Sequence, residues 1–154
     1  MYDLTEVHSG LRFLVQVDGL YNTIFTEFRL PSLSVDLDPL KEGGQNMYTH
    51  QLPVRVNVGT ATLRHGISRD MQMLHWYMQV MSGDFANAYR QVTVMLLDTE
   101  RLPVALWNFR DVLPTKWVGP TLKSASNEVV IEELEFVYHG FMFEGAAPVP
   151  TSSR

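Results

Sequence analysis

Apolar and polar residues alternate through most of the first third of the chain, with the period of two that is typical of β-strands. Asp18-Gly19 supplies turn chemistry after the first alternating segment, and Pro31 precedes the third. We therefore expect the first two segments to form a hairpin and the third to add a short strand. The segments are 11–17, 21–28 and 33–37.

The alternation is clearest at Val54, Val56 and Val58, which are separated by polar residues and predict a half-buried strand. After Gly59 the apolar positions move one residue out of phase. A glycine at such a slip favours a β-bulge or a sharp bend. Upstream, Gly43-Gly44 allows backbone angles closed to other residues, so 39–50 is expected to be a projecting loop.

One helix is predicted, with Ser68 as its N-cap, Asp70 in its first turn and its end near Ser82-Gly83. It is apolar around most of its circumference, so one sheet cannot cover it. We expect a neighbouring subunit or a folded-over loop to cover one of two apolar stripes, although the stripes are interchangeable on sequence alone. The stripe assigned inward is Met71, Leu74, Met78 and Met81; the stripe assigned to a subunit interface is Met73, Trp76, Tyr77 and Val80.

The second half of the chain again predicts strands, at 92–97, 102–109 and 129–143, with a polar connection at 84–90, a turn at 98–101 and an irregular corner at 113–120. In the last strand, Leu134, Phe136 and Tyr138 share the expected core face. Glu133 and Glu135 lie on the other, wet face, which we expect to line either a channel or an outer surface. The tail, about 145–154, is expected to be mobile.

The composition fits a single domain over 1–154, because 154 residues that are 45% hydrophobic supply one core. The net charge of -5 argues against a protein that grips nucleic acid by its phosphates. The N-terminal residues do not resemble a secretory signal, and no apolar run approaches membrane-spanning length, so we expect assembly in the bacterial cytoplasm.

No residues nominate an active site, a metal site or a cofactor. The chain has no cysteine, and its five histidines show no HxxxH or HExxH spacing. Four carboxylates lie close together in sequence, but two of them occupy the polar face of an alternating strand, so a solvated face is a better explanation than general acid–base catalysis. The three tryptophans favour core or interface roles over base stacking, because few basic residues accompany them. The four carboxylates are Glu128, Glu132, Glu133 and Glu135.

Several short motifs, in their order and spacing, resemble the tail tube proteins of contractile phage tails and phage-tail-like injection particles. The resemblance covers about 13–143, and it departs from the family at 30–33, where such proteins more often carry a glycine. The motifs are Glu42-Gly43-Gly44, Asn46, His50-Gln51-Leu52-Pro53, Thr62-Leu63-Arg64-His65-Gly66, Trp107, Leu113-Pro114-Thr115-Lys116-Trp117, Gly119-Pro120 and Ser126-Asn127-Glu128-Val129.

The resemblance implies a mainly β fold whose twisted antiparallel sheets form a barrel-like domain and join across six subunits into a ring barrel. Such rings stack into a tube inside a contractile sheath, start from a baseplate hub, and deliver DNA or effector proteins without catalysis. It also implies that the projecting loop contacts an adjacent ring, through Lys41, Glu42, Gly43, Gly44, Gln45 and Asn46.

Two questions stay open on sequence. The sequence does not separate a major tube subunit from a baseplate tube initiator, and the Glu-Gly-Gly loop and the His-Gln-Leu-Pro entry resemble those of injection particles more than those of DNA phages. A different class, a monomeric lipocalin-like barrel that binds a small apolar ligand, is also all-β with a short helix.

Overall fold

The computed structural model describes residues 11–20, 25–40, 50–67, 69–125 and 127–145, with the side chains of Leu40, His50, Leu52, Val54 and Val56 left undescribed. Within these residues the chain is mainly β, as predicted, with two short helices. The elements are β1 Arg12–Val17, β2 Phe25–Arg29, β3 Leu33–Leu40, β4 His50–Val58, β5 Ala61–Gly66, α1 Gln72–Met81, α2 Phe85–Ala88, β6 Arg90–Leu97, β7 Pro103–Val118, β8 Ile131–Val137 and β9 Gly140–Gly145.

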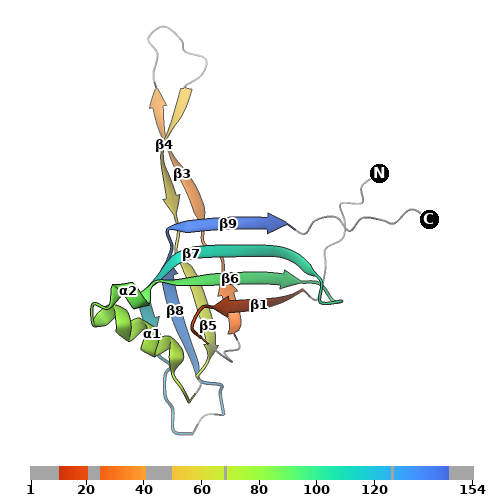
Figure 1. Ribbon diagram of the computed structural model, residues 1–154, viewed down its shortest axis with the longest axis vertical. Helices are drawn as coiled ribbons and strands as arrows, with labels where there is room; N and C mark the ends of the chain where they lie inside the picture. The colour runs from red at the N-terminus through yellow and green to blue at the C-terminus, as the bar shows by residue number, and fades with distance from the viewer. Residues whose placement is uncertain (1–10, 21–24, 41–49, 68, 126, 146–154) are drawn as a thin grey trace, which may run out of the picture.

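The strands form two layers that cross steeply, and β7 belongs to both (Figure 1). In layer A the order is β1, β6, the first half of β7, and β9. In layer B it is β2, β5, β8 and the second half of β7. β7 passes from one layer to the other near Asp111, whose φ of 51° lies in the left-handed region. A backbone bend of this kind lets one strand serve two sheets.

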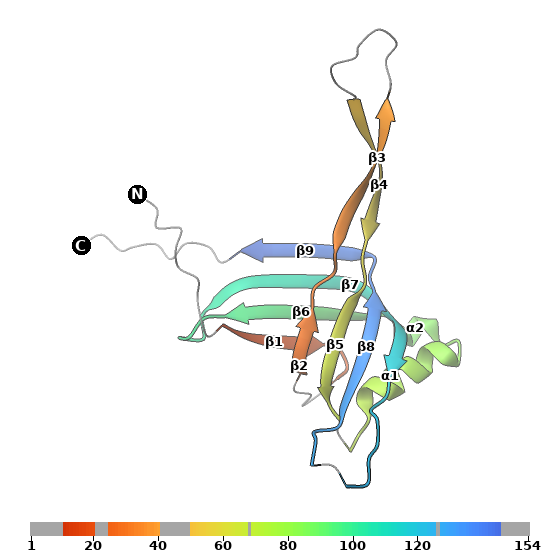
Figure 2. The ribbon, with the colours of Figure 1, turned by 180° about the vertical axis from the view of Figure 1, so that it is seen from behind.

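The core fills the space between the layers, and α1 closes one end of it (Figures 1 and 2). Its centre is aromatic, with Phe109 of β7 packed edge-on against Phe136 of β8 at a centroid distance of 5.8 Å. Trp76 of α1 is fully buried, and its Nε1 donates a 2.6 Å hydrogen bond to the carbonyl of Ala88. This bond ties α1 to α2, and it satisfies the one polar atom of the indole.

The predicted N-terminal hairpin is wrong. Gly19 adopts a φ of 77° and the amide of Leu20 donates to the carbonyl of Val17, so the turn itself forms. The chain then crosses to the other layer instead of folding back. β1 pairs with β6, and β2 pairs with β5, because turn chemistry fixes a local bend but not the partner of the strand that follows.

Three predictions in the second half need correction. The corner at 113–120 continues β7 as far as Val118, with Pro114 at a register shift, where its missing amide donor is tolerated. The single last strand is two strands, β8 and β9, which break at Tyr138-His139 and join different layers. The polar connection contains the short helix α2.

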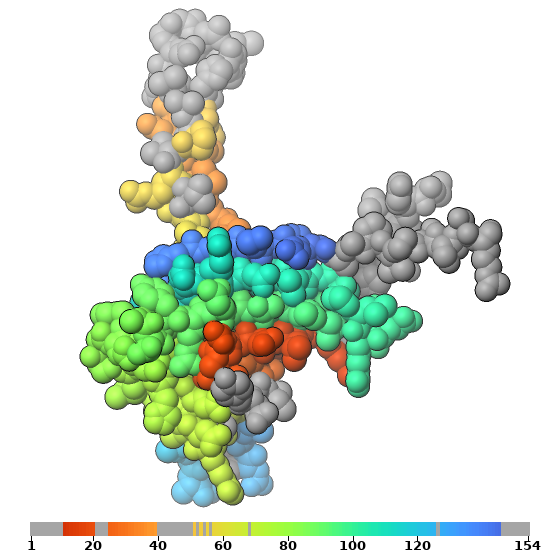
Figure 3. All heavy atoms as spheres, in the orientation of Figure 1, coloured from red at the N-terminus to blue at the C-terminus, as the bar shows by residue number. Residues whose placement is uncertain are grey.

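β3 and β4 form a separate two-stranded ribbon that stands clear of the body (Figure 3). The prediction of a half-buried strand is therefore wrong for the described side chains, because Val58 is 57% exposed. The bend at Gly59 is confirmed: β4 ends before it and β5 starts after it. The Gly59 amide donates a 3.0 Å hydrogen bond to the carbonyl of Ser32, and a Cβ on Gly59 would lie 2.4 Å from that oxygen.

The start of α1 also differs from the prediction. The helix begins at Gln72 after Met71, which occupies the N-cap position with a φ of 44° and no side-chain capping bond. No acidic residue lies in the first turn, so Asp70 precedes the helix, and the predicted cap Ser68 lies outside the described residues. The end near Ser82-Gly83 is confirmed. In the described part of the chain, no helix has the length and apolar character to cross a membrane.

Candidate assembly interface

Layer A has two open edges among the described residues, formed by β1 and β9. In the described part of the chain, β1 pairs with β6 alone and β9 pairs with β7 alone. The two edge strands are six residues long each. An edge strand presents unpaired backbone amides and carbonyls, which are a template for pairing with another chain.

Apolar side chains lie uncovered at both edges, on the side of layer A that faces the core. At the β9 edge, Phe143 packs against Trp107 at a centroid distance of 5.7 Å and is still 58% exposed. At the β1 edge, Leu11 and Phe13 are 40% and 37% exposed. Two apolar edges that continue one core are the pattern of an interface between copies.

The two stripes of α1 are exchanged relative to the sequence assignment. Met73 and Trp76, assigned to a subunit interface, are fully buried within the chain, and Tyr77 packs partly against the same core. Val80, the fourth residue of that stripe, is partly buried. The uncovered stripe is the other one, in which Met78 and Met81 are 51% and 66% exposed, and Met71 and Leu74 are half-buried. Sequence periodicity separates two helix faces but does not say which one meets the sheet.

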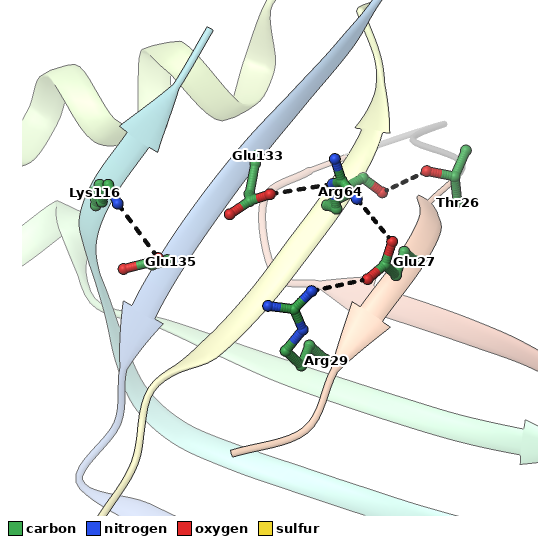
Figure 4. A network of polar contacts seen from close by, with 7 residues as sticks. All are labelled: Thr26, Glu27, Arg29, Arg64, Lys116, Glu133 and Glu135. Carbon is green, nitrogen blue, oxygen red and sulfur yellow. Dashed lines mark hydrogen bonds and ion pairs between the residues drawn. The ribbon is translucent and has the colours of Figure 1, made fainter. Parts of the chain in front are cut away.

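The outer face of layer B carries a row of ion pairs that crosses four strands (Figure 4). Arg64 of β5 lies 3.0 Å from Glu27 of β2 and 3.1 Å from Glu133 of β8. Lys116 of β7 lies 3.6 Å from Glu135. All of these side chains are partly exposed, so the row is a wet face on which Glu133 and Glu135 are paired, and solvent weakens each pair.

A buried polar cluster lies inside layer B, and the sequence analysis missed it. His65 Nε2 of β5 lies 2.6 Å from Glu132 Oε1 of β8, and Trp117 Nε1 of β7 donates a 2.7 Å hydrogen bond to Glu132 Oε2. Burial opposes ionisation of the carboxyl, but the contacts with His65 and Trp117 outweigh it, so the pKa of Glu132 lies below its ordinary value. The cluster ties together three strands of layer B.

A signal for this cluster was present in the alternation. Glu132 has the same parity as Leu134 and Phe136, and His65 has the same parity as Leu63, so both polar residues belong to buried faces. A solvated face therefore accounts for Glu133 and Glu135 but not for Glu132, which is buried.

The remaining predicted site lies beyond what the structure describes. The six loop residues from Lys41 to Asn46 fall within 41–49, and the predicted tail falls almost wholly within 146–154, since Gly145 closes β9. Among the described residues, no group of three or more histidine or acidic side chains is placed to hold a metal ion.

The lipocalin-like alternative is wrong. Among the described residues, large side chains fill the space between the layers and layer A is open at both edges, so this part of the chain is not the closed, hollow barrel of a lipocalin-like carrier. Among the fully buried side chains are Trp76, Phe109, Phe136 and Leu63.

The fold is shared with chains in several solved structures. A chain of the anti-feeding prophage (AFP) baseplate is 24% identical with a TM-score of 0.73, and the match covers 94% of this chain and 98% of that one. A chain of the PVC extracellular contractile injection system, from its sheath-tube complex in the extended state, is 18% identical with a TM-score of 0.72, covering 93% and 95%. A type six secretion system protein is 9% identical with a TM-score of 0.61, covering 86% and 82%.

Comparison with curated proteins finds no significant match. The family model of the T4-like virus tail tube protein gp19, however, matches residues 9–142, which is most of the chain. The two open edges of layer A and the uncovered apolar side chains beside them suit a protein that builds a tube from copies of itself. The chain belongs to the T4-like virus tail tube protein gp19 family, a family of structural, non-enzymatic tube subunits.

Proposed function

We propose that the chain forms six-membered rings by continuing layer A from one copy to the next, and that these rings stack into the inner tube of a contractile injection particle. The observation that carries the proposal is the pair of open, equally long edge strands β1 and β9. Joining them head to tail gives a heterologous interface, which generates a ring when the rotation closes. Closure removes every open edge of layer A.

The strand directions support this joining. All three pairings within layer A are antiparallel. Because the layer has an even number of strands, β9 of one copy runs opposite to β1 of the next copy when both have the same orientation. The antiparallel alternation therefore continues around a rotationally symmetric ring without a break.

The shape of the domain supports one choice of the face that lines the channel. Layer B and the helices lie on one side of layer A, and the wider outer circumference of a ring has the room for them. The other face of layer A then lines the channel, where Thr93 is the cross-strand partner of Gln16 and of Asn108. Leu14 and Met142, which are 56% and 48% exposed, have the strand parity of this face as well, so the proposed channel wall is mixed polar and apolar. The paired Glu133 and Glu135 then lie on the outer wall of the ring.

The partners follow from the relatives, whose structures are a baseplate and a sheath-tube complex. Sheath subunits outside the tube and baseplate proteins at its end are the proposed neighbours, after assembly in the bacterial cytoplasm. Both a major tube subunit and a tube initiator fit this geometry. The loop from Lys41 to Asn46 is the proposed contact with an adjacent ring, because the ribbon that carries it projects from the body (Figure 2).

Electron microscopy of the purified chain, combined with light scattering, tests the proposal. We expect rings or stacked tubes, and we expect deletion of 42–46 to leave rings that do not stack. A wild-type chain that stays monomeric at high concentration contradicts the proposed ring, and long tubes from the deleted form contradict the role of the loop.

A further inference from the structure

The ribbon of β3 and β4 carries an uncovered apolar face. Leu33, Val35 and Leu37 alternate along β3 and are 54%, 48% and 51% exposed, and Val58 lies opposite Leu33. The two strands pack on each other and make no extensive contact with the other described elements. A two-stranded ribbon is marginally stable in water, so this face is expected to rest on another surface.

A second uncovered apolar surface lies in the connection between β7 and β8. Residues 120–124 and 128–131 line an open hollow of about 560 Å³, which is called the 120–131 hollow after the two ends of its lining. Leu122 and Val129 in its wall are 79% and 74% exposed. Most exposed apolar residues in a soluble chain need no explanation, but a hollow that is lined by several of them indicates a binding surface.

These two surfaces lie at opposite ends of the molecule. Along the long axis the ribbon extends past the β9 edge of layer A, whereas the connection between β7 and β8, which contains the hollow, extends past the β1 edge (Figures 1 and 2). The body of the domain separates them, so they do not meet within one chain. In the proposed ring, where β9 of one copy pairs with β1 of the next, the ribbon of the first copy points toward the second copy's β7–β8 connection.

We propose that the apolar face of the ribbon packs into the 120–131 hollow of the neighbouring copy in the same ring. The proposal rests on the ring described above. It adds a second contact to each subunit boundary, beside the pairing of β9 with β1. The charges do not oppose it: Asp36 and Arg55, which are cross-strand partners on the ribbon, lie on the face opposite the apolar one, and the hollow is lined by one charge of each sign, Lys123 and Glu128. Because both contacts point the same way around the ring, a copy in reversed orientation satisfies neither.

Cross-linking between introduced cysteines tests this contact. The chain has no native cysteine, so only the introduced thiols can react with the cross-linker. The variant Val35→Cys/Val129→Cys is treated with a short bismaleimide under conditions in which electron microscopy shows rings. The matched control is Asp36→Cys/Val129→Cys, whose ribbon cysteine lies one residue away on the opposite face of β3. Mixing the two single variants, Val35→Cys and Val129→Cys, shows whether the link joins different copies.

For Val35→Cys/Val129→Cys we expect a ladder of covalently linked oligomers on a denaturing gel. The mixture of the two single variants should give linked dimers and nothing larger, and Asp36→Cys/Val129→Cys should give no ladder. Rings without a ladder, or an equal ladder from the control, overturn the docking contact and leave the ring itself standing. Absence of rings overturns both. Hydrogen exchange of the wild-type chain gives an independent reading: 33–37 and 129–131 must become protected together when rings form, and protection of only one of them contradicts the proposal.

Discussion

His65 Nε2 lies 2.6 Å from Glu132 Oε1, and the two residues are direct cross-strand partners on β5 and β8. Both side chains are almost completely buried, and Trp117 donates to the second carboxylate oxygen from β7. A charge in such a place is tolerated only when partners surround it. One carboxylate therefore couples three neighbouring strands of layer B, at the end of the domain where β7 and β8 are joined by the 120–131 connection.

Removal of one partner from this pair is expected to be costly. His65→Leu leaves the Glu132 carboxylate buried without its partner, so we expect the free energy of unfolding to fall by about 3–5 kcal/mol. The double variant His65→Leu/Glu132→Leu removes both polar groups and should recover much of the loss, because an apolar replacement of a whole buried pair is often neutral. Chemical denaturation of both variants measures the difference.

The matched control is Glu133→Gln, which changes the adjacent residue on the opposite, wet face. Its pair with Arg64 is partly exposed, so we expect a change of only about 0–1 kcal/mol. Similar losses for His65→Leu and Glu133→Gln would show that the buried pair has no special role in stability.

The stability of the fold should depend on pH through Glu132. Its pKa in the folded chain lies below the ordinary value of 4.5, so the unfolded chain takes up the proton first as the pH falls. The stabilisation is therefore complete above pH 4.5 and is lost progressively below it. Denaturation midpoints measured from neutral to acidic pH should fall more steeply for the wild type than for Glu132→Gln. Parallel pH profiles would contradict this.

Gly59 is required by the close approach of two backbone segments at the base of the ribbon. In Gly59→Ala the added Cβ would lie 2.4 Å from the carbonyl oxygen of Ser32, so the backbone has to shift. Overpacking of this kind costs about 1–3 kcal/mol. Gly66→Ala is the control, because its nearest neighbour would lie at an ordinary contact distance of 3.7 Å. Equal denaturation midpoints for the two variants would rule out a tight approach at Gly59.

The two faces of α1 should respond differently to a charge. Trp76→Glu places a carboxylate in the core and removes the hydrogen bond to Ala88, so we expect the domain to unfold. Met78→Glu changes a side chain that is 51% exposed, and we expect a folded chain with impaired assembly. Circular dichroism reports folding and sedimentation reports assembly. The same outcome for both variants would refute the assignment of the two faces.

The local patterns that could be predicted from the sequence are those set by neighbouring residues. Alternation placed Leu134, Phe136 and Tyr138 on a buried face, as the structure confirms. Gly59 marked the bend between ribbon and body, and Ser82-Gly83 marked the end of α1. Each of these features depends on backbone geometry within a few residues.

The features that could not be predicted depend on contacts between distant parts of the chain. β1 pairs with β6, and His65 pairs with Glu132 on a different strand. In both cases the partners are far apart in sequence, so a pattern within a few residues cannot predict the pairing. The exposure of the β3 side chains also depends on distant parts of the chain. Its alternation is that of a half-buried strand, and only the arrangement of the layers shows that no described element covers Leu33 or Val35.

The strand pairing at the boundary between two copies is the most direct test of the central claim. A cryo-electron microscopy map of the assembled rings, at a resolution that separates β-strands, shows which strands meet at each subunit boundary. The account predicts six copies, with β9 of one copy antiparallel to β1 of the next and an unbroken sheet around the channel. A ring in which β1 and β9 stay unpaired, or in which the copies meet through layer B, would contradict it.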